Sequence, residues 1–233
     1  TTLAFVAIDE NGEREFSFAR KPGADTQLRA DELDKELLQN CRIFHFGSLS
    51  LTDQPAKDAT VAAVTCAKEA GALISYDPNY RATLWSSEAE AAENMKSMIS
   101  YADVMKVSDE ESLLLTGETT YEAAADKLLA MGPKLIAVTL GSEGVLMATK
   151  EKKERMKGFS VQSVDTTGAG DIFHGAFTYG LANGFDMDKI VTFANIAAGL
   201  SVTKMGSRLS IPSLSEVMDY YNARFNVSGL PQT

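Results

Sequence analysis

The sequence predicts an α/β protein built on a mainly parallel β-sheet. Strand-like apolar runs alternate along the chain with segments of helical periodicity. Runs such as residues 72–77 and 134–139 are apolar almost throughout, as expected of strands buried on both faces. Helix-length segments join these runs, and such connections are typical of parallel βαβ units. A length of 233 residues with 45% hydrophobic side chains fits one large domain or two small ones.

The elements follow one another in a regular order. Two strand-like runs, residues 1–9 and 14–20, open the chain, and the Asn11-Gly12 pair between them is typical of a tight hairpin turn. Further strands are predicted at residues 42–47, 72–77, 103–107, 134–139, 143–149 and 153–156. Helices are predicted at residues 31–38, 55–70, 88–100, 109–115 and 121–131. Three helices, at residues 168–182, 187–203 and 213–225, complete the pattern.

Charge and composition narrow the function. The chain carries 32 acidic and 22 basic residues, and its formal charge of −10 argues against nucleic acid or an anionic membrane as the main partner. No apolar run approaches the roughly 20 residues that span a bilayer. Cys41 and Cys66 form no CxxC pair, which argues against a disulfide framework or a zinc site. We expect a soluble, cytoplasmic protein that acts on small molecules.

The run DTTGAGD, residues 165–171, is the most informative stretch. Two glycines at the start of a helix let the backbone approach a ligand closely, and the N–H groups there favour an anion. Asp171, in the first turn, is placed to accept a proton from a hydroxyl that attacks beside that anion. The alternative is an ordinary helix start, capped by Asp165 or Thr166, with Asp171 favourable to the helix dipole. The run is neither a Walker A loop nor GxGxxG, since Phe173 stands where the third glycine would be.

A second glycine-containing loop, residues 139–144, follows a buried strand. Its hydroxyls and glycines suit a loop that lies along the phosphates or ribose of a nucleotide, and a tight turn between strands is the alternative.

Together these segments resemble the ribokinase-like, or phosphofructokinase B, family of carbohydrate kinases. DTTGAGD resembles the family's signature, and residues 139–144 its nucleotide loop. Residues 77–81, DPNYR, resemble its D-x-N-x-R segment. Residues 106–111, KVSDEE, resemble its N-x-x-E segment with Ser108 in place of Asn. The resemblance covers nearly the whole chain and is greatest to the bacterial fructokinases. It implies a three-layer α/β/α sandwich with a mainly parallel central sheet and a small β lid.

The resemblance implies ATP-dependent phosphorylation of a sugar primary hydroxyl, with fructose as the first choice. Asp171 would be the catalytic base, and the amides of Gly168, Ala169 and Gly170 would stabilise charge on the transferred phosphoryl group. Glu111 would position Mg²⁺ through water, although a Ser108–Glu111 capping box explains that pair equally well. The implied ATP-binding residues are Ser108, Thr139, Gly141, Ser142, Gly144 and Asn195.

Two further sites are implied by the same resemblance. Arg81, Asn79 and Arg20 are the candidates for contact with the sugar or a phosphate; a guanidinium suits a phosphate or a sugar acid, since it offers a bidentate fork. The resemblance also implies a K⁺ site beside the anion hole, where Lys204 would contribute only its backbone oxygen. Its matching positions are Asp165, Thr167, Ser201, Lys204, Gly206 and Ser210.

Several alternatives stay open at this point. Arg20 and Arg81 would also suit a carboxylated sugar, so 2-keto-3-deoxygluconate is a rival substrate, as are ribose and a nucleoside. A non-catalytic sugar- or nucleotide-binding relative is a rival of another class, although Asp171 argues against it. A dehydrogenase is disfavoured because no GxGxxG follows a strand.

The resemblance also predicts the division of the chain. Residues 1–20 would be part of the lid, residues 21–226 the α/β kinase core, and residues 227–233 a tail. In the family, a segment ahead of the position of Thr1 supplies the first strands, a sugar-binding Gly-Gly motif and half of the lid. We therefore expect the 233 residues alone to be inactive, and we expect the lid to form a homodimer interface.

Overall fold

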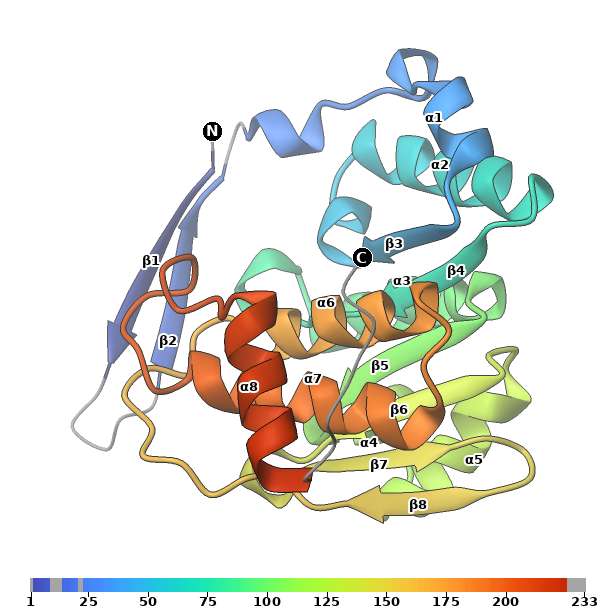
Figure 1. The fold of residues 1–233 in the computed structure, drawn as a ribbon. Helices are drawn as coiled ribbons and strands as arrows, with labels where there is room; N and C mark the ends of the chain where they lie inside the picture. Colours follow the sequence, from blue (N-terminus) through green and yellow to red (C-terminus); the bar gives the residue numbers. More distant parts are fainter. Residues whose placement is uncertain (1, 9–13, 21–22, 226–233) are drawn as a thin grey trace. The chain divides into compact units, whose positions relative to one another are not determined.

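The structure is a computed structural model that describes residues 2–8, 14–20 and 23–225 (Figure 1). The predicted Asn11-Gly12 turn and the predicted tail lie outside these residues. The chain divides into two compact units. The first comprises Thr1–Ile136 with Ala148–Lys150, and the second Ala137–Met147 with Glu151–Thr233.

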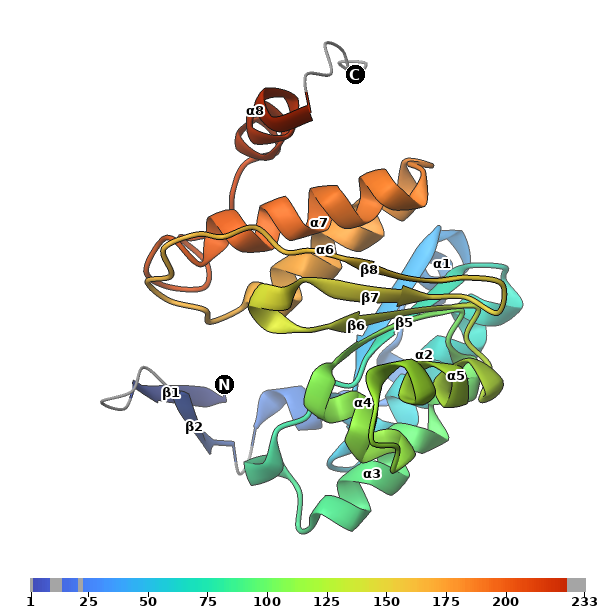
Figure 2. The ribbon, with the colours of Figure 1, turned by 90° about the horizontal axis from the view of Figure 1, so that it is seen from below.

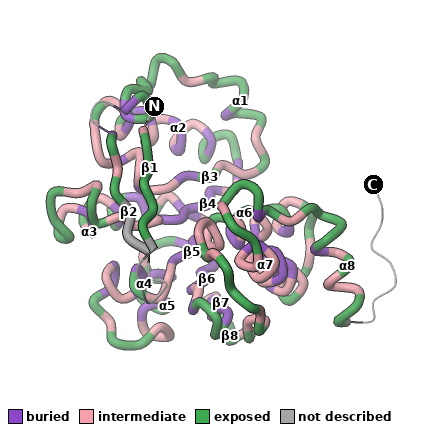
Figure 3. Tube along the Cα trace, turned by 90° about the vertical axis from the view of Figure 1, so that its left-hand side faces the viewer, coloured by how far each residue is buried: buried purple, intermediate pink, exposed green. Residues whose placement is uncertain are grey.

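An antiparallel hairpin opens the first unit, as predicted. Strand β1 (Leu3–Ile8) pairs with β2 (Arg14–Ala19), and its register sets Leu3 opposite Ala19 and Phe5 opposite Ser17. The two strands form a small sheet of their own. Leu3 and Phe5 share one face of β1 because side chains alternate along a strand, and they are 55% and 57% exposed. Figure 3 shows β1 coloured as exposed and the strands of the main sheet with buried stretches.

The main sheet has six strands in the order β3-β4-β5-β6-β7-β8. The pairs β3/β4 and β4/β5 are parallel, as the alternating pattern predicts. The boundary between the two units falls within β6 and β7. The strands are β3 (Ile43–Gly47), β4 (Leu73–Asp77), β5 (Val104–Ser108), β6 (Leu135–Thr139), β7 (Val145–Ala148) and β8 (Lys153–Met156).

Side-chain caps start most helices of the first unit. Asp34, Ser87, Ser108 and Thr120 each accept a hydrogen bond from the backbone N–H three residues later, which satisfies one of the unpaired amides of a helix start. The helices are α1 (Lys35–Asn40), α2 (Ala56–Glu69), α3 (Glu88–Ser97), α4 (Asp109–Thr116) and α5 (Tyr121–Ala130). The predicted helix at 31–38 is wrong in its first half, because Ala30–Glu32 forms a separate 3-10 turn and the Asp34 cap begins α1 only at Lys35.

The core of the first unit centres on β4 and β5. Ile74, Tyr76, Met105 and Val107 are fully buried, and the Tyr76 ring stacks on Phe46 of β3 at 4.5 Å between centroids. Ligands of open α/β sheets sit beyond the carboxyl ends of the strands. Asp77 and Ser108 are the last residues of β4 and β5 and therefore stand where a site is expected.

Three helices, α6 (Ala169–Ala182), α7 (Met187–Ser201) and α8 (Leu214–Phe225), dominate the second unit. Helices α6 and α7 lie side by side (Figures 1 and 2). They approach closely at Gly180, where a Cβ would come within 2.9 Å of Ile190 Cγ1. Helix α8 packs on α7 through a buried apolar cluster formed by Phe193, Ile196, Ala197 and Val217.

None of the helices in the described part of the chain is long and apolar enough to cross a membrane.

Candidate active site

Helix α6 begins at a glycine that adopts a left-handed conformation. Gly168 has φ 81° and is the N-cap of α6, without a side-chain cap. The Ala169 N–H donates to the Thr166 carbonyl at 3.2 Å, while the other early amides have no acceptor within the helix. The alternative of an ordinary start capped by Asp165 or Thr166 is therefore wrong. Of the three amides predicted to form the anion hole, that of Ala169 already has an acceptor in the protein. The amides of Gly168 and Gly170 are therefore the better candidates for binding an anion.

Asp165 connects two loops instead of capping the helix. One carboxylate oxygen accepts from the Thr167 N–H and the other from the Gly206 N–H, both at 2.9 Å. The Asp165 N–H in turn donates to the Val202 carbonyl at 3.2 Å. The loop before α6 is thus fastened to the loop after α7, and three of the predicted K⁺-site residues come together.

The other residues predicted for K⁺ lie in the same loop region. Ser201 and Ser210 are both 2% exposed. The Ser201 carbonyl accepts from the Lys204 N–H at 3.2 Å, and the Lys204 ammonium pairs with Glu216 at 3.1 Å. The charge of Lys204 is thus directed to Glu216 of α8, and the K⁺ site itself stays a prediction.

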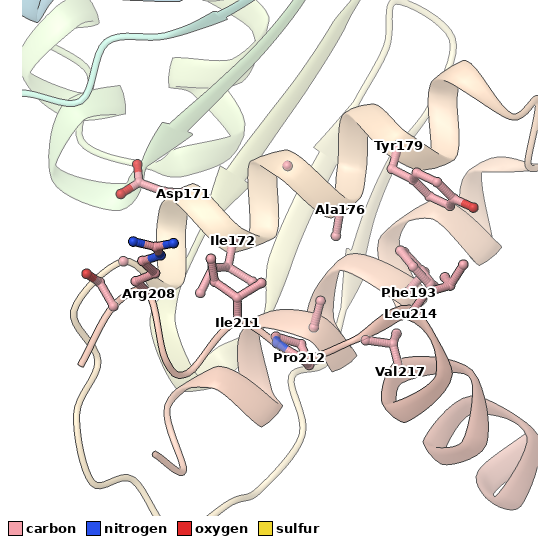
Figure 4. Close-up of a pocket in the computed structure, with 14 residues that line it drawn as sticks. Asp171, Ile172, Ala176, Tyr179, Phe193, Arg208, Ile211, Pro212, Leu214 and Val217 are labelled. Carbon is pink, nitrogen blue, oxygen red and sulfur yellow. The ribbon is translucent and has the colours of Figure 1, made fainter. Parts of the chain in front are cut away.

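Asp171 is exposed in the first turn of α6 and lines an open cavity of about 540 Å³. Figure 4 shows its carboxylate and the Arg208 guanidinium at one end of this cavity. Gly168 lines it as well, so the cavity reaches the helix start. The remaining wall is mostly apolar, with contributions from Ile172, Ala176, Tyr179, Phe193, Ile211, Pro212, Leu214 and Val217.

A second cavity, of about 320 Å³, touches the same helix start. We call it the loop cavity because the predicted nucleotide loop contributes Gly141 and Ser142 to it. Thr166 and Ala169 line it at the start of α6, and Asn195 lines it from α7. Three segments that are far apart in the sequence therefore contribute these five residues to one cavity. Four of them were predicted as ATP-binding or anion-hole residues; Thr166 was named only as a candidate cap.

Sequence reasoning missed much of the wall of the loop cavity. The segment before DTTGAGD contributes to it, and so does one face of α7. On α7 the spacing i, i+3, i+4, i+7 from Asn195 was a usable signal, because it marks a single helix face. The missed residues are Gly158, Phe159, Ser160, Val161, Ser163, Ala198, Gly199 and Val202.

Gly144 has a packing role behind this loop. Its φ is 101°, and a Cβ there would collide with the backbone of Met156 and Gly158. Gly158 is equally constrained, since its Cβ would come within 2.7 Å of the Ser142 carbonyl oxygen. Two backbones thus touch without side chains between them, which fixes the loop that follows Thr139 at the end of β6. Gly144 itself is not among the residues that line the loop cavity.

In the first unit, a buried ion pair lies at the ends of β4 and β5. The Lys106 ammonium and the Asp77 carboxylate are 3.0 Å apart, and their side chains are only 7% and 5% exposed. The other Asp77 oxygen accepts from the Asn79 N–H at 3.1 Å. Asn79 has φ 49° and is the one non-glycine residue with positive φ in the described part of the chain. The ion pair therefore supports the turn that carries the predicted substrate contacts.

Glu111 joins this turn to the start of α4. One of its carboxylate oxygens accepts from the Tyr80 N–H at 2.6 Å and the other from the Ser108 N–H at 2.8 Å. The Ser108 hydroxyl accepts from the Glu111 N–H at 3.2 Å, so the predicted capping box is present. Each carboxylate oxygen keeps a further lone pair, which fits Mg²⁺ held through water. Among the described residues, no three His, Cys, Asp or Glu side chains cluster as direct metal ligands.

The two predicted arginines differ in their partners. Arg81 donates to the Tyr80 carbonyl at 2.8 Å and is half-buried at the end of the turn. The guanidinium of Arg20 is buried and donates to Asp25 at 2.8 Å, Thr52 at 2.8 Å and the Leu49 carbonyl at 2.7 Å. Arg20 thus ties the end of the hairpin to the loop after β3. These protein partners explain why the guanidinium can be buried, and no ligand is needed for that.

The comparisons with known proteins agree on one family. A model of the pfkB family carbohydrate kinases matches residues 1–214. The chain is 42% identical over 221 residues to probable fructokinase-5 of Arabidopsis thaliana, covering 91% of this chain and 68% of the relative. It is also 42% identical to fructokinase-1 of Zea mays over 226 residues, or 94% of this chain and 70% of the relative.

Solved structures give the same result. A fructokinase from Xylella fastidiosa with bound ATP superposes with a TM-score of 0.87 at 33% identity, over 96% of this chain and 74% of that one. A fructokinase variant from Vibrio cholerae O395, bound to fructose, ADP and potassium, gives 0.86 at 32% identity, over 94% and 72%. A putative ribokinase II from E. coli, in complex with ATP and Mg²⁺, gives 0.84 at 30% identity, over 94% and 70%.

This chain belongs to the pfkB family of carbohydrate kinases. The predicted ribokinase-like fold, with its mainly parallel sheet and separate antiparallel hairpin, is confirmed.

Proposed function

We propose that this chain carries the catalytic core of an ATP-dependent fructokinase. The observation that carries the proposal is the start of α6, where Gly168 opens the helix in a left-handed conformation and two cavities reach it. Asp171 lines the cavity on one side, and the loop cavity lies on the other. The 40–42% identity to plant fructokinases and the bacterial fructokinase structures favour fructose over the other sugars.

The reaction uses the two sides of the helix start differently. Asp171 accepts the proton of the sugar's primary hydroxyl while that oxygen forms a bond to the γ-phosphorus of ATP. The bond from the γ-phosphorus to the β-γ bridging oxygen breaks, and ADP leaves. The amides of Gly168 and Gly170 donate to the oxygens of the phosphoryl group in transfer, with Ala169 engaged in the turn of the helix start. Positioning and such electrostatic stabilisation supply most of the acceleration in phosphoryl transfer.

ATP would occupy the loop cavity. Ser142 and the Gly141 backbone suit its phosphates or ribose, and the Asn195 amide suits polar atoms of its base. Thr139 and Gly144 would support the site from the loop, and Ser108 is kept as an ATP contact on the resemblance alone. Mg²⁺ would be held through water by Glu111 and would neutralise phosphate charge when bound. K⁺ would occupy the loop region fastened by Asp165, with Thr167 and Gly206.

The sugar contacts are proposed at the end of β4. Asn79 and Arg81 stand on the turn held by Asp77 and Glu111. Arg20 is the weaker candidate, since Asp25, Thr52 and Leu49 already occupy its donors. We also propose a cytoplasmic homodimer formed through the hairpin, which the exposed Leu3 and Phe5 on one face of β1 support.

A sugar panel tests this function most simply. The full-length protein would be incubated with ATP, Mg²⁺ and fructose, ribose, 2-keto-3-deoxygluconate or a nucleoside, with and without K⁺, and ADP release would be measured. We expect fructose to give the highest kcat/KM and K⁺ to raise turnover. Preference for another acceptor would revise the substrate. If no tested acceptor led to ADP release, the kinase assignment would be contradicted.

A further inference from the structure

One wall of the loop cavity is an aromatic side chain that the catalytic scheme does not use. Phe159 lines the cavity just after Gly158. It also packs against the apolar cluster between α7 and α8, formed by Phe193, Ile196, Ala197 and Val217. The side chain therefore contributes both to the cavity wall and to the packing against this cluster.

Two side chains of α8 restrain the Phe159 ring. The Arg224 guanidinium carbon lies over the ring at 4.8 Å from its centroid. The Tyr220 ring meets it edge-on, with 6.0 Å between centroids and an angle of 76° between planes. Cation–π and edge-to-face contacts both favour one ring orientation. Helix α8 thus sets the orientation of this wall, although none of its described residues lines the loop cavity.

The α7 wall of the same cavity has small side chains. Asn195, Ala198, Gly199 and Val202 share one face of α7. A Cβ built on Gly199 would meet no atom within 4 Å, so the glycine leaves space there. An aromatic ring and a shallow apolar helix face suit a flat heterocycle, because every nucleobase presents a π-face for stacking.

We propose that the nucleobase of ATP stacks on Phe159, and that Arg224 and Tyr220 are positioning residues that hold the ring for it. The inference rests on the proposed nucleotide-dependent function and adds α8 as the element that sets nucleotide affinity. Binding of the phosphate end of the nucleotide, at Thr166 and Ala169, is not expected to depend on this contact.

The chain offers a matched control for the α8 contact. Lys189 lies over the ring of Phe185 at 4.0 Å from the centroid. This is a second cation–π contact in the same unit, and neither of its residues lines the loop cavity. Lys189→Met therefore removes the same kind of interaction as Arg224→Met without touching the proposed stacking surface.

The test measures ADP and tripolyphosphate binding by calorimetry on the full chain, with thermal melts to verify folding. Phe159→Leu should weaken ADP binding about tenfold, and Arg224→Met about threefold. Tripolyphosphate, which has no base, should bind all variants alike. Phe159→Tyr should restore ADP affinity, and Lys189→Met should leave it unchanged.

Two results would overturn the proposal while the wild type still binds ADP. One is ADP affinity that does not change in Phe159→Leu. The other is a parallel loss of ADP and tripolyphosphate binding, which would reveal a purely structural role. A wild-type protein that does not bind ADP at all would instead contradict the proposed function and this inference together.

Discussion

The two units use their charged groups in opposite ways. In the second unit, Asp171 is exposed in the first turn of a helix that starts at Gly168 without a side-chain cap. In the first unit, Asp77, Lys106 and Glu111 are buried and bound to one another or to backbone amides. An exposed carboxylate that lines a cavity is accessible to a substrate. The buried charges are engaged by protein partners, and their hydrogen bonds hold the turn at residues 77–81 in place.

Breaking the ion pair of the first unit should have the largest effect on stability. Lys106→Met leaves the Asp77 carboxylate buried without its counter-ion, and loss of one partner of such a pair costs about 3–5 kcal/mol. Urea denaturation would measure it. Lys152→Met is the matched control, because its pair with Glu154 is exposed and screened by solvent, and its loss is expected to change stability much less. If both variants lost the same free energy of unfolding, burial would not make the Asp77 pair more important for stability than an exposed pair.

A methyl group at the start of α6 should disturb both stability and rate. In Gly168→Ala the residue must keep φ near 81°, which costs about 1–2 kcal/mol for an L-residue, and its Cβ would lie 3.2 Å from Ser207 Cβ. We expect kcat to fall while the KM for sugar stays close to the wild-type value. Chemical denaturation and steady-state kinetics would measure the two effects. A fully active, equally stable variant would show that the left-handed start is dispensable.

Removing the cap of α4 should have a smaller effect. Ser108→Ala loses the hydroxyl that accepts from the Glu111 N–H, which costs about 1 kcal/mol at a helix start. Ser108→Asn should restore the cap, since Asn is also a strong N-cap residue. Thermal melts of the two variants would compare them. If Ser108→Asn also raises ATP affinity, the side chain at this position contacts phosphate or its water.

The smallest effect should be a pH dependence at the start of α8. The Ser213 N–H, and next the Lys204 ammonium, hold the pKa of Glu216 at about 2, below its usual value of 4.5. Because the folded pKa is lowered, this stabilisation is present above about pH 4.5 and is lost as the pH falls towards about 2. In Glu216→Gln the melting temperature should depend less on pH within that window than it does in the wild type. An unchanged pH profile would contradict the assignment, and added salt should weaken the Lys204 contribution.

The sequence predicted the parts that depend on local rules. The DTTGAGD helix start, the Ser108–Glu111 capping box and the opening hairpin all rest on glycine, capping or turn chemistry within a few residues. The structure confirms each as an element, apart from the turn at Asn11-Gly12, which is not described.

What the sequence could not predict depends on tertiary contacts. Phe159 and Gly199 are unremarkable in the sequence, and only packing brings them to one cavity. Arg20 was predicted to meet a ligand, and its three protein partners lie 5 to 32 positions away. Gly144 is predicted to contact the nucleotide, which stays a prediction. Its close backbone neighbours at Met156 and Gly158 belong to another strand and the loop after it. No short-range pattern encodes such approaches.

The central claim is that Asp171 removes the proton of the sugar hydroxyl beside the anion site at Gly168. Its most direct test is the turnover of Asp171→Asn in the full-length protein, with ADP affinity and thermal stability measured on the same sample. We predict that kcat falls by about 10²–10⁴ while ADP binding and the melting temperature stay at wild-type values. Turnover within a few-fold of the wild type would contradict the claim and would favour a binding role for this helix start.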